Sequence, residues 1–260
     1  MNESLQKLEH QWALELEQWA IPTYTTDKLE ESPFTLVPNA FEPDDSRLST
    51  PTMQNALEIL KKPGSSLLDV GAAAGGTSLI LIPPATHVTA VDQNPQMLEQ
   101  LLANAKARDI SPDKVLTIHS NWPCETEVRA TVVINANVLY NVAHPIKFIS
   151  ALYGAAQTRL IIELTSHHPH HNLNEAYLTL HDFKRPEGPT YLNILDIISA
   201  LGYSFKTEIW ERDMGIRLGG DIEHLARRAS IPQVRLPEFT EFLEKHPLKR
   251  SQVVTITIDK

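Results

Sequence analysis

The sequence has 260 residues and is 42% hydrophobic, so one domain with appendages is enough to account for the length. Its 23 lysines and arginines stand against 32 aspartates and glutamates, and the net charge of −9 disfavours nucleic acid as the main partner. A single cysteine, Cys124, excludes an internal disulfide framework and a thiolate metal site, and it indicates a reducing compartment.

The N-terminal segment, residues 3–20, predicts an amphipathic helix. It is too charged for the apolar core of a signal peptide, and no window reaches the roughly 20 apolar residues of a membrane span, so we expect a cytoplasmic protein. Trp12 and Trp19 either form a lid over a ligand or anchor the helix to the domain, and both alternatives stay open. One apolar stripe results from leucines and tryptophans spaced by three and four: Leu5, Leu8, Trp12, Leu16 and Trp19.

Five prolines between residues 21 and 51 predict an irregular connector. We therefore expect residues 1–50 to form an N-terminal helix and connector that caps the protein, and residues 51–260 to form the main domain. Two insertions, near 165–190 and 212–240, are expected to cover the ligand site of that domain.

From residue 53 onward, helical and extended segments alternate. This alternation implies an α/β protein with a parallel sheet, right-handed crossovers and helices on both faces. The C-terminal segment alternates strictly, which suits one antiparallel strand closing one end of the sheet. The sequence thus predicts a Rossmann-like, seven-stranded, mostly parallel sheet. Helices are expected at 53–60, 95–107, 145–153 and 191–201, and strands at 66–70, 87–91, 114–119, 130–135, 159–164, 205–210 and 252–258.

The string SLLDVGAAAGGT, residues 66–77, predicts a buried strand, a loop of small residues and a short helix that ends at Pro83 and Pro84. Small residues let the backbone approach a ligand closely, and a helix N-terminus offers amide donors. As a dinucleotide fingerprint that starts at Gly71, the string has Ala73 where the second glycine approaches the pyrophosphate. A nicotinamide dehydrogenase is therefore disfavoured, and a purely structural turn remains the alternative to a ligand loop.

Within this string, LLDVGAAAGG resembles motif I of the class I S-adenosylmethionine-dependent methyltransferases, with Ala73 in place of the middle glycine. The resemblance covers residues 52–211 and the final strand. It implies S-adenosylmethionine as cofactor. Asp92 ends the next predicted strand, and the family uses a carboxylate at this position to accept hydrogen bonds from the ribose hydroxyls. The cofactor residues implied in these two segments are Asp69, Gly71, Ala73, Gly75, Asp92 and Gln93.

The third and fourth predicted strands supply the remaining candidate residues. By the same resemblance, Asn121 and Trp122 stand where the family contacts the adenine. The fourth segment, VVINANVLYNVAHP, is similar to the motif that faces the donor and the substrate. Tyr140 and His144 are the catalytic candidates, and His144 is either a general base or simply the residue that precedes a helix at Pro145. The polar candidates in this segment are Asn135, Asn137, Tyr140, Asn141 and His144.

The resemblance implies a methyltransferase, and the acidic total charge favours a small molecule as methyl acceptor. Two alternatives remain: a non-catalytic S-adenosylmethionine-binding regulatory module, since fold does not fix function, and a methyltransferase that acts on protein or RNA. The strings NVLYNV and RLIIELTSHHPHHNLNEAYLTLHDFKRPEGPT resemble a group of bacterial methyltransferases, but this closer likeness supplies no acceptor.

Three further features have competing interpretations. The histidines at 167, 168, 170, 171 and 181 either bind a metal or lie in a solvated loop, and because carboxylates at a regular spacing are missing, we expect no metal site. Arg185 either binds an acidic substrate or lies in a surface turn. Arg227, Arg228 and Arg235 either contact phosphate or form a solvated helix face.

Overall fold

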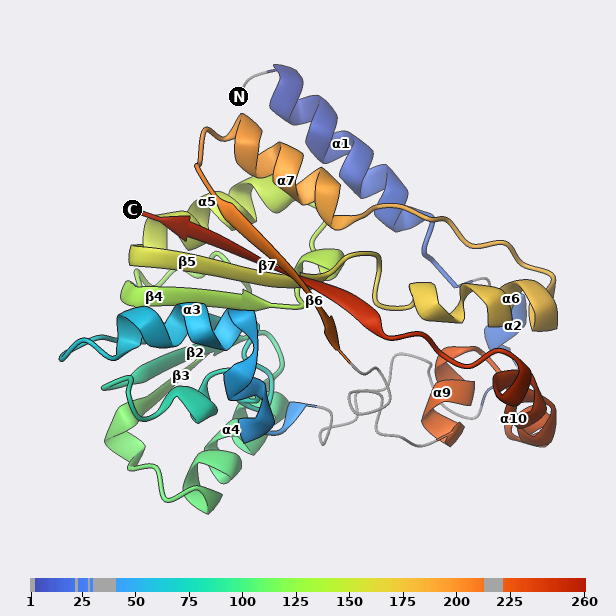
Figure 1. Cartoon of the computed structure of the whole chain (residues 1–260), viewed down its shortest axis with the longest axis horizontal. Coiled ribbons are helices and arrows are strands. Elements are labelled where there is room, and N and C mark those ends of the chain that lie inside the picture. Colours follow the sequence, from blue (N-terminus) through green and yellow to red (C-terminus); the bar gives the residue numbers. More distant parts are fainter. Residues whose placement is uncertain (1–2, 22, 28, 30–40, 213–221) are drawn as a thin grey trace.

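The computed structural model describes residues 3–21, 23–27, 29, 41–212 and 222–260. Seven strands form one sheet in the order β3-β2-β1-β4-β5-β7-β6 (Figure 1). Strands β1 to β5 run parallel, and β7 is antiparallel to both β5 and β6. The predicted Rossmann-like sheet with one antiparallel C-terminal strand is confirmed. The strands are β1 Leu67–Val70, β2 Val88–Asp92, β3 Val115–His119, β4 Ala130–Ala136, β5 Ala156–Thr165, β6 Lys206–Arg212 and β7 Ser251–Asp259.

The alternation of the C-terminal segment predicts a strand that closes one end of the sheet, and this prediction is wrong. Strand β7 lies between β5 and β6. Six consecutive residues of β7 are buried, so both of its faces are covered. Thr255 is compatible with burial because its hydroxyl finds partners: it lies 2.7 Å from the hydroxyl of Thr52 and accepts from Nε1 of Trp210 at 3.0 Å.

Helices cover both faces of the sheet, as predicted (Figure 1). One core cluster joins α1, α5 and α7 to one face, and a second joins α3 and α4 to the other. Helices α3, α4 and α5 each begin with a proline at the first helical turn, where its missing N–H costs nothing. The helices are α1 Glu3–Glu17, α2 Thr23–Thr26, α3 Pro51–Leu60, α4 Pro95–Ala107, α5 Pro145–Ala155, α6 Asn174–His181, α7 Tyr191–Ala200, α9 Ile222–Arg228 and α10 Leu236–Lys245.

The helix predicted after the glycine-bearing loop is absent: among residues 71–87 only Leu79–Leu81 are helical, as one 3₁₀ turn. The turn ends at Ile82, which has an extended backbone before Pro83. The loop itself, rather than a regular helix, therefore supplies an amide donor at the end of β2, the N–H of Ala73.

The two predicted insertions pack together as a helical lobe, here α6, α9 and α10 with their connections. Its core contains Tyr177, Phe239 and Phe242 and is separate from the clusters on the sheet. Figure 1 shows this lobe beside the ends of the strands, at the right of the view. Residues 213–221 of the second insertion, and residues 22, 28 and 30–40 of the connector, lie outside the described residues.

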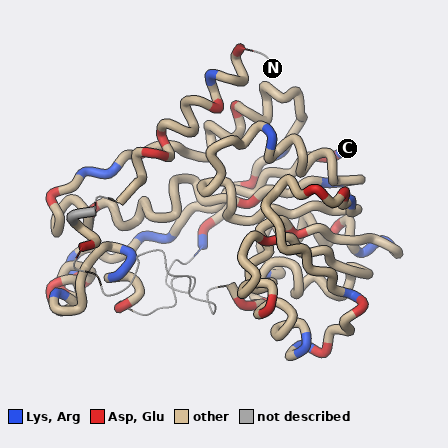
Figure 2. The backbone as a smooth tube through the Cα atoms, turned by 180° about the vertical axis from the view of Figure 1, so that it is seen from behind, with Lys and Arg blue, Asp and Glu red and all other residues tan. Residues whose placement is uncertain are grey.

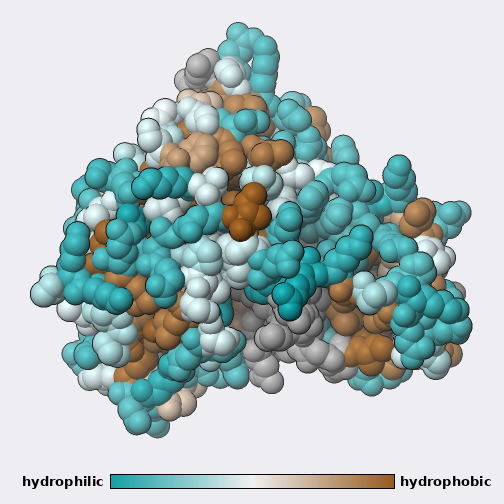
Figure 3. Space-filling view, viewed as in Figure 1, coloured by the Kyte–Doolittle hydropathy of each residue, from teal (hydrophilic) through white to brown (hydrophobic). Residues whose placement is uncertain are grey.

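Surface charge follows the composition. Figure 2 shows basic and acidic residues interspersed along the described backbone, without a continuous basic stripe. In Figure 3 much of the visible face is hydrophilic, with hydrophobic residues gathered over α7. Of the helices described, none combines the length and the apolar character needed to cross a membrane.

Candidate active site

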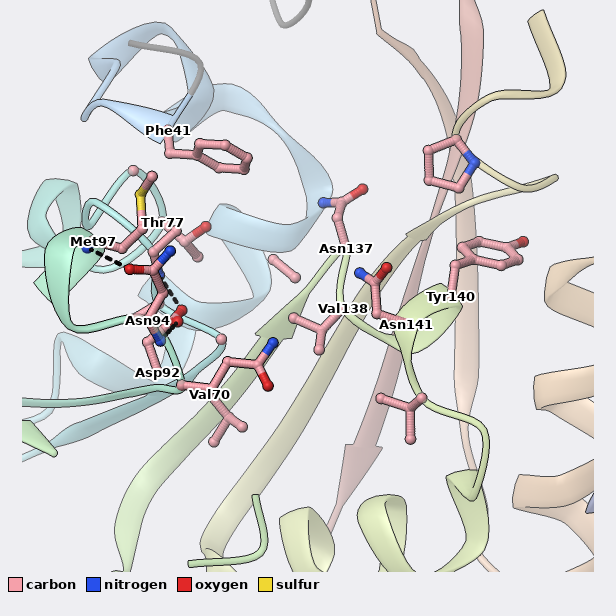
Figure 4. Close-up of a pocket in the computed structure, with 18 of the residues that line it drawn as sticks. Phe41, Val70, Thr77, Asp92, Asn94, Met97, Asn137, Val138, Tyr140 and Asn141 are labelled. Atoms are coloured by element: carbon pink, nitrogen blue, oxygen red, sulfur yellow. Dashed lines mark hydrogen bonds between the residues drawn. The ribbon is translucent and has the colours of Figure 1, made fainter. Parts of the chain in front are cut away.

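A cavity of ≈ 640 Å³ opens at the carboxyl ends of the parallel strands. Its size falls within the range of small-molecule pockets, roughly 300–1,000 Å³. The strand order reverses between β1 and β4, and ligands of open α/β sheets bind at such a switch point. In Figure 4, Asp92 and Asn94 lie on one side of the cavity and Tyr140 on the other, with Asn137 and Asn141 between them.

Asp92 joins the end of β2 to the loop after β1. Its Oδ2 accepts a hydrogen bond from the backbone N–H of Ala73 at 2.8 Å, and its Oδ1 accepts from the N–H of Asn94 at 2.8 Å. A carboxylate has about four lone-pair sites, so each oxygen can accept one more hydrogen bond. Asp92 lines the cavity, and the two hydroxyls of a ribose are suitable donors.

The loop after β1 has the left-handed backbone that its small residues permit. Gly71, Ala73 and Gly75 have φ values of +78°, +45° and +85°. A Cβ on Gly71 would overlap the side chain of Val138, so glycine is required there for space as well as for conformation. Gly71 and Ala73 line the cavity, and this places the loop backbone where a ligand can approach closely.

Two of the implied motif residues, Asp69 and Gly75, do not line the cavity. Asp69 is 1% exposed, and burial raises its pKa to about 7. A Cβ on Gly75 would lie 2.7 Å from Leu79 and 3.0 Å from Leu101. Both residues therefore shape the loop from behind, within the core.

Asn121 and Trp122, implied at the adenine, line the cavity, and so does Gln93, the residue after Asp92. The Trp122 ring is held by its Nε1, which donates to the carbonyl of Phe148 at 3.3 Å. Asn135 does not line the cavity, because its Nδ2 turns inward and donates to the carbonyl of Val70 at 2.8 Å. It ties β4 to β1 instead.

The two catalytic candidates are separated. Tyr140 lines the cavity, but its hydroxyl donates to the carbonyl of Thr165 at 2.9 Å, and burial raises its pKa. His144 is outside the cavity lining, and its side chain is 79% exposed, 3.9 Å from Glu9. The interpretation of His144 as the residue that precedes a helix fits this position, since α5 begins at Pro145.

A buried ionic cluster that the sequence does not predict lies behind Asn137. Oε1 of Glu163 accepts from Nδ2 of Asn137 at 2.7 Å, from Nη1 of Arg212 at 3.2 Å and from Nη2 of Arg47 at 3.5 Å. Glu163 is 0% exposed, whereas Arg47, Arg212 and Asn137 line the cavity. Asn137 is one of the polar candidates from the sequence, but no sequence signal marks Arg47 and Arg212, which come from the connector and from β6.

The histidine segment is packed rather than solvated. His168 and His170 line the cavity, and the His168 ring stacks on Trp19 with centroids 4.1 Å apart. Burial, with smaller contributions from Arg185, His171 and Arg228, lowers the pKa of His168 to about 3. Within the described part of the chain, no group of three or more His, Cys, Asp or Glu side chains is arranged to hold a metal ion.

Arg185 fits neither of its two interpretations. It is 3% exposed and lies over the ring of Tyr177 at 3.7 Å and that of Trp19 at 5.3 Å. Trp12 is also buried: its ring stacks on Tyr140 at 5.5 Å, and its Nε1 donates to the carbonyl of Val142 at 2.8 Å. Neither tryptophan lines the cavity, so the structure supports the anchoring alternative for α1.

No family model and no curated protein matches the sequence, whereas many solved structures match the fold. A magnesium protoporphyrin IX methyltransferase from Synechocystis, solved with bound S-adenosylhomocysteine, is 13% identical over 82% of each chain, with a TM-score of 0.54. The chain has the class I methyltransferase fold. A putative methyltransferase from Bacillus halodurans is 14% identical over 81% of this chain and 98% of its own, with a TM-score of 0.59.

A third methyltransferase structure, from Geobacter sulfurreducens in complex with S-adenosylhomocysteine, is 15% identical over 92% of this chain and 98% of its own, with a TM-score of 0.54. In this class I methyltransferase fold, the loop that resembles motif I and the carboxylate of Asp92 lie on one wall of the cavity. The histidine segment and Arg228 of the helical lobe line another part of it.

Proposed function

We propose that this chain is an S-adenosylmethionine-dependent methyltransferase that acts on a small molecule. The observation that carries the proposal is Asp92, which lines the cavity, holds the loop after β1 through the N–H of Ala73 and keeps acceptor capacity toward the cavity. The loop, the carboxylate and the strand order thus support the motif resemblance independently of sequence identity. Structures of this fold with bound S-adenosylhomocysteine point to the same ligand.

The donor would lie with its ribose at Asp92, its adenine between Gln93, Asn121 and Trp122, and its methionine part toward Gly71 and Asn137. The bound donor supplies an electrophilic methyl group on a sulfonium. This methyl group would be transferred to a lone pair of the acceptor, with S-adenosylhomocysteine as the leaving group and any acceptor proton released to solvent. The protein has to align the acceptor and exclude water.

The described residues divide these tasks. Tyr140 offers no base, because its hydroxyl already donates to Thr165, so we assign it the cavity wall rather than proton transfer. We propose that the helical lobe, through His168 and Arg228, covers the acceptor. Trp12 of helix α1 and Trp19, which follows the helix, support this wall from outside.

Two measurements test the proposal. Calorimetry with S-adenosylmethionine, S-adenosylhomocysteine and NAD is expected to show binding of the first two and none of the third, and selective NAD binding would reject it. Incubation with labelled S-adenosylmethionine and a metabolite panel is expected to transfer the labelled methyl group and yield S-adenosylhomocysteine. If the protein binds the donor but transfers no methyl group to any small molecule, protein or RNA tested, the result would favour a non-catalytic regulatory module.

A further inference from the structure

The charged side chains that line the cavity are mostly positive, whereas the net charge of the whole chain is negative. The protein carries a net charge of −9, yet among the described lining residues the acidic side chain is Asp92 and the basic ones are Arg47, Arg212 and Arg228. Asp92 is at the end of β2, whereas Arg212 is at the end of β6 and Arg228 is in the helical lobe. The excess positive charge is therefore in the part of the cavity away from the implied ribose site.

Arg47 and Arg212 are only partly neutralised, because both contact the same oxygen of Glu163. Arg47 also donates to the carbonyl of Gly76 at 2.9 Å, which fixes it to the loop after β1. A donor at this loop brings its own carboxylate, and Arg47 is the arginine placed to receive it. That pairing leaves Arg212 and Arg228 for a second anion.

Arg228 is the critical residue. It is half-buried and lines the cavity, and its buried Nε makes no hydrogen bond with any residue that the structure describes. The neighbouring cation Arg227 and the buried Arg185 increase the local positive charge, and the nearby His168 is packed against Trp19 and offers no negative charge. A partly dehydrated guanidinium that has no counterion among the described residues is unfavourable, and an oxyanion such as a carboxylate or a phosphate is its natural partner.

We propose that the methyl acceptor carries an oxyanionic group, a carboxylate or a phosphate, which binds to Arg228 with support from Arg212. This inference rests on the proposed function, because it assigns the second half of the same cavity. The anion would serve as the handle that orients the acceptor relative to the donor methyl group.

The test uses the full-length protein saturated with S-adenosylhomocysteine, titrated calorimetrically with inorganic phosphate, acetate, acetamide and choline. We expect phosphate or acetate to bind and the neutral and cationic probes not to bind. Tighter binding of phosphate assigns a phosphate handle, and tighter binding of acetate a carboxylate handle. In the Arg228→Gln variant the anion affinity should fall about tenfold or more. The anion affinity of Arg228→Lys should lie between those of Arg228→Gln and wild type.

Arg235→Gln is the matched control, because Arg235 is a half-buried arginine of the same lobe that does not line the cavity and pairs with Glu238 at 2.7 Å. It should keep wild-type anion affinity, and all three variants should keep wild-type S-adenosylhomocysteine affinity and melting temperature. The inference is overturned if wild type binds S-adenosylhomocysteine but no anion, if Arg228→Gln leaves anion affinity unchanged, or if it weakens S-adenosylhomocysteine as much as the anion. Failure of wild type to bind S-adenosylhomocysteine would instead overturn the proposed function.

Discussion

The backbone N–H of Ala73 points at the carboxylate of Asp92, 2.8 Å away, and so joins two segments that are separated in sequence. Ala73 has a φ of +45°, a conformation that L-residues other than glycine adopt at a cost. The resemblance to motif I places a glycine at this position. The hydrogen bond to Asp92 offsets part of the cost and keeps the loop shaped without that glycine.

Ala73→Gly should therefore stabilise the protein. The left-handed conformation costs an alanine about 1–2 kcal/mol, and glycine loses about 0.5–1 kcal/mol through the entropy of the unfolded chain, so we expect a net gain of about 0.5–1 kcal/mol. Urea denaturation measures it. Ala74→Gly, the same change at a buried neighbour with no positive φ, should destabilise, and equal effects at the two positions would show that strain at Ala73 is not the cause.

Gly71→Ala should destabilise the protein by about 2–3 kcal/mol, because the added methyl group overlaps Val138 and the φ of +78° is unfavourable for alanine. Val138→Ala removes the overlapping methyl groups. In a double-mutant cycle, the combined variant should lose less stability than the sum of the two single variants, by about 1 kcal/mol. Strict additivity would show that the close approach of Val138 does not matter.

Burial of His168 predicts a stability that declines on the acidic side. Its pKa is 6.5 as an ordinary histidine and about 3 in the folded protein. Below pH 6.5 the unfolded chain binds a proton that the folded protein does not. The free energy of unfolding therefore falls by up to about 1.4 kcal/mol per pH unit as the pH drops toward 3. Above pH 6.5 the contribution of the neutral imidazole to stability is complete.

His168→Gln should reduce this acid-side slope, as measured by urea denaturation at several pH values from neutral to acidic. His144→Gln is the control, since His144 is 79% exposed, and it should leave the slope unchanged. Parallel pH profiles for wild type and His168→Gln would contradict the assignment of a neutral, buried imidazole.

Helix α1 should stabilise the fold rather than act as a lid over the donor. Trp12→Ala removes a fully buried ring that stacks on Tyr140, and we expect a loss of about 3–5 kcal/mol in unfolding free energy. Trp12→Phe keeps a ring but loses the hydrogen bond to Val142, for a smaller loss of about 1–2 kcal/mol. Stopped-flow displacement should give the same donor off-rate in Trp12→Phe and wild type, and a several-fold faster rate at unchanged stability would restore the lid hypothesis.

Periodicity and spacing predict the parts of this fold that depend on local chemistry. Alternating apolar runs predict the strands, and Asp92 could be found because it ends a strand at the spacing that a ribose carboxylate requires. The helix predicted after Gly76 is reduced to one 3₁₀ turn at Leu79–Leu81, which the loop pattern does not predict. Strand β7 lies inside the sheet, where the hydroxyl of Thr255 pairs with that of Thr52, and no strand pattern encodes this contact with a distant helix.

The cavity beyond the donor site depends on contacts between distant segments. Arg47 and Glu163 meet across 116 residues, so neither stands out in the sequence. Arg228 belongs to an arginine pair for which phosphate contact is one sequence-based hypothesis, but only the packing of α9 beside the sheet brings it to the cavity. His144, beside a helix start in the sequence, remains at that helix start in space and points to solvent.

The donor site at Asp92 is tested most directly by calorimetric titration of S-adenosylmethionine into wild type, Asp92→Ala and Asp92→Asn. Asp92→Ala should weaken binding by about 1.5–3 kcal/mol, the scale of lost charge-assisted hydrogen bonds, while Asp92→Asn, which keeps an acceptor for the N–H of Ala73, should weaken it less. Asp113→Ala, at an exposed carboxylate, should bind as wild type. Unchanged affinity in a folded Asp92→Ala variant would contradict the assignment of this cavity to the donor.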